Sequence, residues 1–209
     1  MPEKMIDKIH WLGHDSFRVD GSRTVYFDPW DVTGDIKADI IMISHEHYDH
    51  CSPDDVAKLS KPYTVVVTEP ECAKKLSGNI KTIKPGQTID VNGVKITGVP
   101  SYNTDKQFHP QQNNWLGFIA EIDGVKIYHA GDTDFIPEMK KLDVDIALLP
   151  VSGTYVMNAD QAIQAARAIK PKIAVPMHYD KIVGTVSDAE KFANALKKEM
   201  TVVIKEKEA

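Results

Sequence analysis

The sequence predicts a mixed α/β protein in which two β-sheets carry helices on their outer faces. Residues 40–43, Ile-Ile-Met-Ile, form an apolar run typical of a short strand that is buried on both faces. The dipeptides Asn-Gly at 92–93 and Asp-Gly at 123–124 separate strand-like runs and are typical of two-residue hairpin turns. The segment Asn-Ala-Asp-Gln at 158–161 has the pattern of a capping box, which begins a helix.

The first half of the chain alternates predicted strands with short helices. Ser52 is a candidate N-cap, Pro53 follows at the first helical position and two acids lie in the positive first turn, so we expect a helix to Leu59. Pro70 begins a second short helix, expected through Leu76. The predicted strands of this half occupy residues 8–12, 16–19, 24–27, 40–43, 63–68, 80–83, 88–91 and 94–99.

The second half repeats this order of strands and then helices. Capping boxes at 158–161 and 187–190 predict helices to about Ile169 and Leu196. Residues 102–114 are polar and without periodicity, which is typical of a functional loop. Four side chains are candidates for the lining of a pocket at this loop: Phe108, Trp115, Tyr155 and Met157. The predicted strands of this half occupy residues 116–122, 125–129, 145–149 and 173–175.

Composition argues against several classes of function. A chain of 209 residues with 42% hydrophobic and 26% charged residues is ordinary for a globular protein with a sizeable core. No apolar stretch approaches the roughly 18 residues of a membrane-spanning helix, so we expect no membrane span. The formal charge of −5 argues against nucleic acid as a partner, because phosphate backbones are held by clustered Lys and Arg.

The N-terminus and the cysteines both favour a cytoplasmic location. The first residues lack the apolar core of a signal peptide. Two cysteines, Cys51 and Cys72, cannot form a disulfide framework, which agrees with a reducing compartment. Cys51 follows His50 directly and is interpreted as a small buried thiol, with a place near a metal as the alternative.

Three histidines and two acids follow the apolar run 40–43. Alternation along an extended backbone places His45 and His47 on one side, from which two imidazoles reach one metal ion. Asp49 and His50 follow in a turn, which can direct them at a second ion close to the first. Neutral imidazoles and a carboxylate at this spacing are the ligands that a borderline-soft divalent ion prefers, so the sequence predicts a metal site.

This segment, His-Glu-His-Tyr-Asp-His at 45–50, resembles the metal motif of the metallo-β-lactamase superfamily. Asp-Pro at 28–29, Gly-Asp-Thr at 131–133 and Pro-Met-His-Tyr at 176–179 fall in the order that the family uses. The opening segment 11–17 is similar to the compact branch of ascorbate-6-phosphate lactonases and of the phospholipase D type that cleaves N-acyl phosphatidylethanolamine. The resemblance covers nearly the whole chain. It implies a four-layer αβ/βα sandwich, in which residues 1–209 form one metallo-β-lactamase-like domain built from two similar β/α halves.

The resemblance also implies roles for residues outside segment 45–50. The carboxylate of Asp132 would bridge both ions, and His178 would be the last ligand of the second ion. Asp28 would orient a ligand from behind without binding metal. His14 either lines the site or caps a β-turn.

One expected ligand of the first ion does not stand where the family has it. Many members carry a histidine directly after the strand that corresponds to residues 94–99, but here that place reads Pro-Ser-Tyr-Asn. His109 is the nearest histidine and is assigned to the first ion. Asn103 is the alternative, as a weak oxygen ligand or as a polar contact to substrate.

The predicted function is that of a metal-dependent hydrolase with two ions, Zn²⁺ in the first place and Mn²⁺ or Fe²⁺ as alternatives. Two cations that share a water lower its pKa to about 7, and the resulting bridging hydroxide attacks an acyl carbon or a phosphorus. Asp49 and Asp132 are the catalytic candidates. Asp49 has an oxygen that can orient the hydroxide or pass a proton to the leaving group.

The expected partner is a small-molecule substrate, namely a phosphorylated ester, lactone or phosphodiester, because the similar branch of the family handles these. A non-catalytic metal-binding sensor or scaffold of the same fold is the alternative, and operation with a single ion is also open. The oligomeric state is open as well, with a homo-oligomer among the options.

Overall fold

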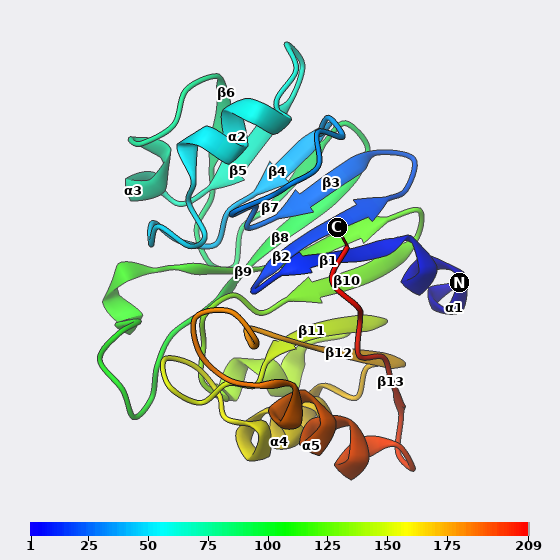
Figure 1. Ribbon diagram of the computed structural model, residues 1–209. Coiled ribbons are helices and arrows are strands. Elements are labelled where there is room, and N and C mark those ends of the chain that lie inside the picture. The colour runs from blue at the N-terminus through cyan, green and yellow to red at the C-terminus, as the bar shows by residue number, and fades with distance from the viewer. Residues whose placement is uncertain (209) are drawn as a thin grey trace.

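The computed structural model describes residues 1–208 and contains two β-sheets packed between helices. Helices α2 (Pro53–Leu59) and α3 (Pro70–Ala73) cover the outer face of the first sheet (Figure 1). Helices α4 (Ala159–Ile169) and α5 (Val186–Leu196) cover the second sheet. The layers are therefore helix, sheet, sheet and helix, and the predicted four-layer sandwich is confirmed. A short helix, α1 (Pro2–Met5), precedes β1.

The first sheet, as far as residues 1–208 extend, contains six strands in chain order. They are β1 (Ile9–Gly13), β2 (Ser16–Asp20), β3 (Thr24–Phe27), β4 (Ile40–Met42), β5 (Val65–Thr68) and β6 (Asn79–Thr82). The first three strands are antiparallel, and β3 to β6 run parallel. The carboxyl ends of the parallel strands thus meet at one edge, where the segment after β4 emerges.

The second sheet, in the described part of the chain, contains seven strands in the order β13-β12-β11-β10-β9-β8-β7. They are β7 (Thr88–Val91), β8 (Val94–Pro100), β9 (Leu116–Ile122), β10 (Val125–His129), β11 (Ile146–Pro150), β12 (Ile173–Met177) and β13 (Thr201–Val202). Strands β7 to β10 are antiparallel, and β10 to β13 are parallel. The loops after β10 and β12 carry an aspartate and a histidine of the predicted metal site.

The main core lies between the two sheets and beneath α4 and α5. Phe17 and Phe27 from the first sheet and Phe118 from the second belong to it, and all three side chains are fully buried. A second, smaller core lies between the first sheet and helices α2 and α3, where Ile41 is fully buried. The side chains of β4 enter both cores in alternation, which is why residues 40–43 are apolar throughout.

Two predicted caps are present and one lies elsewhere. Ser52 caps α2, and the capping box at 158–161 begins α4 as expected. In α5 the capping residue is Thr185, whose backbone N–H donates to the Asp188 carboxylate at 2.9 Å. Thr185 has extended dihedral angles while Ser187 is already inside the helix, so the predicted cap at Ser187 was two residues late.

A few elements differ from the sequence prediction. Helix α3 ends at Ala73 instead of Leu76, and α1 and β13 were not predicted. The 3-10 turns at Ile6–Lys8, Gln111–Asn113 and Pro137–Lys141 were not predicted either. These elements are short, so their sequences show too few repeats of a period to be recognised. No helix within residues 1–208 is long and apolar enough to cross a membrane.

The two cysteines are joined, which corrects the interpretation of Cys51 as a free thiol. Cys51 and Cys72 form a disulfide with a Cα–Cα distance of 6.4 Å. Both residues are buried in the smaller core, where the segment before α2 packs near α3. Their separation of 21 residues carries no local signal, because only tertiary packing brings the two side chains together.

Candidate metal centre

Loops at the carboxyl ends of strands β4, β8, β10 and β12 bring all the predicted metal-site residues together. The segment after β4 contributes four of them, and the loops after β8, β10 and β12 contribute one each. The residues that meet are His45, His47, Asp49, His50, His109, Asp132 and His178. They form two neighbouring clusters, which are described in turn.

The first cluster contains His45, His47 and His109, whose ligand nitrogens all lie within 4.8 Å of one another. His45 Nε2 lies 3.0 Å from His47 Nδ1, and His109 Nε2 lies 3.1 Å from an oxygen of Asp132. Trp115 packs against the rings of His45 and His47, with centroid distances of 4.7 and 4.8 Å. Three imidazoles from two distant segments thus converge on one point.

The second cluster contains His50, Asp132 and His178. His50 Nε2 lies 3.4 Å from Asp132 Oδ1, and His178 Nε2 lies 3.3 Å from Asp132 Oδ2. Asp49 is at its edge, with one carboxylate oxygen 3.8 Å from His50 Nε2. The Asp132 carboxylate therefore lies between the two clusters, with His109 on one side and His50 and His178 on the other.

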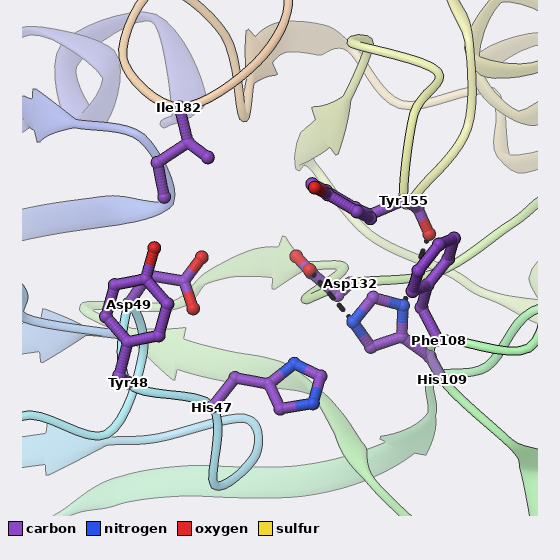
Figure 2. Close-up of a pocket in the computed structure, with 8 residues that line it drawn as sticks. All are labelled: His47, Tyr48, Asp49, Phe108, His109, Asp132, Tyr155 and Ile182. Atoms are coloured by element: carbon purple, nitrogen blue, oxygen red, sulfur yellow. Dashed lines mark hydrogen bonds and ion pairs between the residues drawn. The ribbon is translucent and has the colours of Figure 1, made fainter.

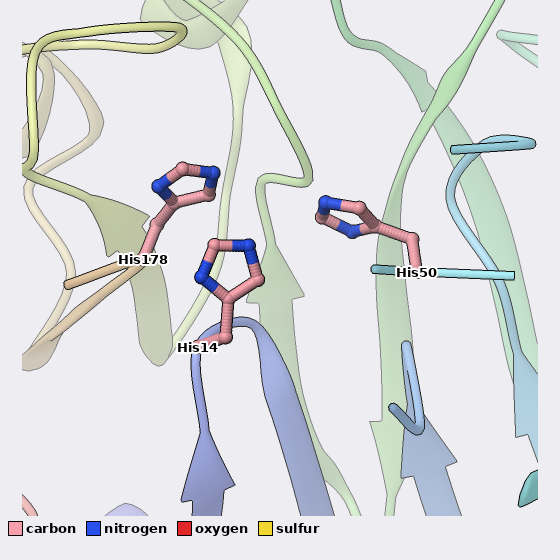
Figure 3. Close-up of side chains that lie close together, drawn as sticks. All are labelled: His14, His50 and His178. Carbon is pink, nitrogen blue, oxygen red and sulfur yellow. The ribbon is translucent and has the colours of Figure 1, made fainter. Parts of the chain in front are cut away.

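His14 both forms a turn and faces the second cluster, so both options from the sequence apply. Figure 3 shows the rings of His14, His50 and His178 turned toward one another from three separate segments. The His14 and His178 ring centroids are 4.1 Å apart, and His14 Nε2 lies 3.1 Å from Asp49 Oδ2. His14 has a left-handed backbone with φ 52°, as the tight β1–β2 turn requires.

Asp28 lies behind the two clusters and fixes the rings of two histidines. Its carboxylate accepts hydrogen bonds from the Ser44 backbone N–H at 2.7 Å, the Ser44 hydroxyl at 2.6 Å and His50 Nδ1 at 2.8 Å. Because the Ser44 hydroxyl donates to Asp28, it accepts from His45 Nδ1 at 2.9 Å. In both histidines Nδ1 therefore carries a proton, and Nε2 points into the cluster. Burial alone would lower the pKa of His50, but the charges of Asp132 and Asp28 raise it well above 6.5, so without metal its Nε2 is protonated as well, and a bound cation would displace that proton.

Asn103 fixes His109 in the same way and does not face the cluster itself. Its side-chain oxygen accepts from the His109 backbone N–H at 2.9 Å and lies 3.2 Å from His109 Nδ1. The Tyr155 carbonyl oxygen lies 3.2 Å from the same nitrogen. Two acceptors at Nδ1 require a proton there, so the lone pair of His109 Nε2 faces Asp132.

Burial keeps most of the imidazoles neutral. It lowers the pKa of His45 well below the ordinary value of 6.5, with the His50 charge as the second cause. It also lowers the pKa of His47, where His109 is the next cause. Burial lowers the pKa of His14 to about 4, although the hydrogen bond to Asp49 opposes this. Neutral imidazoles are the form that binds metal.

The pKa values of three carboxyl groups at the site are shifted, two downward and one upward. Burial alone would raise the pKa of Asp132, but His178 and His50 hold it well below 3.8. Burial also opposes the ionisation of Asp49, yet the hydrogen bond from His14 and the charge of His50 lower its pKa to about 2. Burial and the charge of Asp132 raise the pKa of Asp15 well above 3.8.

Unsatisfied polar atoms are concentrated at the two clusters, and they fit a metal centre. An orphaned buried polar atom is costly, so a group of them indicates a missing partner. His109 Nε2 and Asp132 Oδ2 also face each other at 3.1 Å with lone pairs on both atoms, which only a cation or a proton can bridge. The buried site atoms without a hydrogen-bond partner in the described residues are His14 Nδ1, both oxygens of Asp15, His50 Nε2, His109 Nε2, Asp132 Oδ1 and His178 Nε2.

Asp15 is the site residue that the sequence analysis missed. It lies in the β1–β2 turn, is fully buried, and has a carboxylate oxygen within 4.8 Å of ligand atoms of His50, Asp132 and His178. Its backbone carbonyl oxygen accepts a hydrogen bond from His129 Nε2 at 2.9 Å, which holds the turn against β10. An acid beside His14 in a turn was an available signal, but Asp is so common in turns that it carried little weight.

A pocket opens from the clusters to the surface. Figure 2 shows Tyr48 and Asp49 on one side of the pocket, Phe108, His109 and Tyr155 on the other, and Asp132 between them. The rings of Phe108 and Tyr155 meet edge to face with centroids 4.8 Å apart. The eight lining residues are His47, Tyr48, Asp49, Phe108, His109, Asp132, Tyr155 and Ile182, and none of these eight is a Lys or Arg.

Two of the four side chains expected at the pocket do not line it. Trp115 is buried behind His45 and His47, where it holds their rings. Met157 is fully buried in the main core, because the segment before α4 turns inward there. Phe108 and Tyr155 line the pocket as expected.

Comparisons with known proteins identify similar chains. Residues 8–178 match a family model described as a β-lactamase superfamily domain. A UPF0173 metal-dependent hydrolase of Thermoplasma acidophilum is 34% identical over 201 residues, which cover 88% of each chain. Among solved structures, a provisionally assigned metal-dependent hydrolase from Parabacteroides distasonis has a TM-score of 0.85 and 36% identity, with 96% of this chain and 93% of that chain covered. A provisionally assigned zinc-dependent hydrolase of the metallo-β-lactamase superfamily from Thermotoga maritima has a TM-score of 0.65 and 25% identity, with 94% and 97% covered.

Proposed function

Because the chain belongs to the metallo-β-lactamase superfamily, we propose that it is a metal-dependent hydrolase whose two ions are held by the two histidine clusters. The superfamily, which the resemblance of segment 45–50 predicted, is confirmed by the family match and by the relatives. The observation that carries the proposal is the set of buried ring nitrogens and carboxylate oxygens without a partner, gathered at the base of one pocket.

The ligands are assigned from the direction of their lone pairs. His45, His47 and His109 would hold the first ion, and Asp132 would bridge both. The second ion would be held by Asp49, His50 and His178 together with Asp132. Asp28 would act through His50, as a carboxylate commonly does for a histidine that binds metal.

Two such ions, when bound, supply a hydroxide at neutral pH and polarise the oxygen of a scissile carbonyl or phosphoryl group. Asp49 would orient the attacking group, because one of its oxygens is held by His14 at 3.1 Å and it forms part of the pocket wall. With a pKa of about 2, Asp49 is an acceptor and a poor donor of a proton to a leaving group. Of the two roles that the sequence left open for Asp49, orientation is therefore the better supported.

The pocket lining favours an uncharged ester or lactone with an apolar substituent over a phosphorylated substrate. Phe108 and Tyr155 offer an apolar wall, and none of the lining side chains is cationic. The nearby cations are already paired: Lys106 with Asp134 at 2.6 Å, and Lys181 with Asp31. Among charged groups, only the ions themselves would therefore attract a phosphate group. Esters, lactones and phosphodiesters remain the proposed classes, with acyl substrates first.

Metal removal tests the proposal. The purified protein should carry close to two ions per chain, and a chelator should abolish hydrolysis of 4-nitrophenyl butyrate while the far-UV circular dichroism stays unchanged, since the sheets have an apolar core of their own. His47→Ala should weaken metal binding, whereas His10→Ala, on the exposed side of β1, should not. Turnover that persists after complete metal removal would exclude this mechanism. Two tightly held ions without turnover of carboxyl or phosphate esters would instead favour the sensor or scaffold.

Zinc is the first choice for the ions, with Mn²⁺ or Fe²⁺ as alternatives, since three imidazoles suit Zn²⁺ at the first site. We also propose one domain of two β/α halves and a small-molecule substrate. A cytoplasmic location is proposed as well, although the disulfide between Cys51 and Cys72 removes the argument from free thiols. The oligomeric state stays open and is accessible to light scattering.

A further inference from the structure

Asp15 is buried among the groups proposed to hold the second ion, yet the two-ion site above gives it no role. Its side chain is fully buried, and neither of its carboxylate oxygens has a hydrogen-bond partner in the described part of the chain. One of these oxygens lies within 4.8 Å of ligand atoms of His50, Asp132 and His178. A buried carboxylate without any donor needs either a proton or a cation.

The atoms that face Asp15 are themselves possible ligands of a cation. Asp132 Oδ1, His50 Nε2 and His178 Nε2 are all buried and have no hydrogen-bond partner within residues 1–208. Nδ1 of His50 donates to Asp28, so Nε2 is the ring nitrogen that faces Asp15 and Asp132 and that a cation would use. His129, the other imidazole nearby, donates its Nε2 proton to the Asp15 backbone oxygen and not to the carboxylate.

The geometry points to Asp15 as an additional ligand of the second ion, and we propose on this basis that the second site prefers an ion that accepts five or six ligands, such as Mn²⁺ or Fe²⁺. This inference rests on the proposed function, because it assumes that the second site binds metal. With Asp15 included, the site offers three carboxylates, from Asp15, Asp49 and Asp132, and two imidazoles. A tetrahedral zinc site uses four ligands, whereas oxygen-rich sets of higher coordination suit Mn²⁺ and related ions.

The same inference distinguishes the two sites chemically. The first site has three imidazoles and shares only the Asp132 carboxylate, a set that suits Zn²⁺. Two divalent cations bring four positive charges, and Asp15 raises the number of carboxylates that face them from two to three. The second site thus has the more anionic and the more crowded set of ligands.

Titration calorimetry of the metal-free protein with Mn²⁺ and with Zn²⁺ tests the assignment. The variant Asp15→Asn keeps the size of the side chain and removes its charge. We expect this variant to lower the affinity of one of the two sites for Mn²⁺ by about 100-fold or more, which exceeds most effects of residues that only orient a ligand. The affinity of the other site for Zn²⁺ should not change. Asp143→Asn, which changes a carboxylate on the surface beside Lys126, is the control and should change neither site.

Thermal unfolding supplies a second readout that a purely structural role would not reproduce. In the metal-free protein Asp15→Asn should raise the melting temperature, because burial beside the charged Asp132 makes an ionisable carboxyl group unfavourable at this position and an amide carries no charge. In Mn²⁺ the stabilisation gained on binding should be smaller than in the wild type. Asp15→Ser, which also removes the carboxylate, should give the same signs if Asp15→Asn does not fold.

The possible failures are distinguishable. If the wild-type chain binds no ions, the proposed function fails. If the wild-type chain binds two ions and both variants keep wild-type affinity for Mn²⁺ at both sites, the assignment of Asp15 alone is overturned. Loss of both sites to the same extent, or a lower melting temperature in metal-free variants, would mean that Asp15 only supports the fold.

Discussion

Breaking the disulfide between Cys51 and Cys72 should measurably destabilise the first half of the protein. The two residues are 21 positions apart, and the bond closes a loop that includes all of α2, β5 and the start of α3. In the chain-entropy account, a loop of this size contributes about 3 kcal/mol by restricting the unfolded chain. For a protein of about this length, 3 kcal/mol corresponds to a melting temperature lower by about 6 to 12 °C.

Calorimetry of the metal-free protein with and without a phosphine reductant measures this difference without interference from metal binding. The reduced protein should melt at the lower temperature. The double variant Cys51→Ala, Cys72→Ala should also melt below the oxidised wild type and should not respond to the reductant. The pairing would be refuted if the denatured, unreduced protein had two reactive thiols per chain. Equal melting temperatures before and after reduction would also refute it, and the interpretation of two buried thiols would then hold.

Four further substitutions test hydrogen bonds, three at the site and one in the main core. Asp28→Asn should lower metal affinity about 10- to 100-fold, because it loses the charged acceptor behind a ligand histidine, and metal competition titration measures this loss. His109→Ala should lower the metal affinity of the first site by more than Asn103→Ala does. The effect of Asn103→Ala should stay within about 10- to 100-fold, because Asn103 only orients the His109 ring. Equal effects of the two substitutions would contradict this. Tyr128→Phe should leave stability unchanged or raise it by about 1 kcal/mol, since the buried hydroxyl has no partner in the described structure, and a clear drop in melting temperature would show that it has one.

Elements with a local signal were predicted well. The strand Thr24–Phe27, the hairpin at 92–93 and the helix Ala159–Ile169 agree with the prediction because each is specified by neighbouring residues: side-chain alternation, a turn dipeptide and a capping box. The late cap of α5 shows where such signals compete. Thr185 and Ser187 both precede suitable partners, and only the dihedral angles of the folded chain select Thr185.

The two alternatives for the third histidine of the first site could not be separated from the sequence. His109 and Asn103 lie six residues apart in one loop, and either side chain could have faced the other histidines. The loop folds so that the Asn103 amide reaches His109 and the Tyr155 carbonyl. That arrangement depends on residue 155, which comes from the far half of the chain.

The sequence by itself determined most of the strands and helix caps, because each of these depends on residues within one short segment. Its short motifs also determined the superfamily and the set of histidines and aspartates expected at the site. Only the tertiary structure decided which ring nitrogens face the site, placed Asp15 among them, and joined Cys51 to Cys72. The physical reason is distance along the chain. A hydrogen bond, an ion pair or a disulfide forms between atoms a few ångströms apart, and for these residues that proximity is created by two sheets packing together rather than by any local pattern.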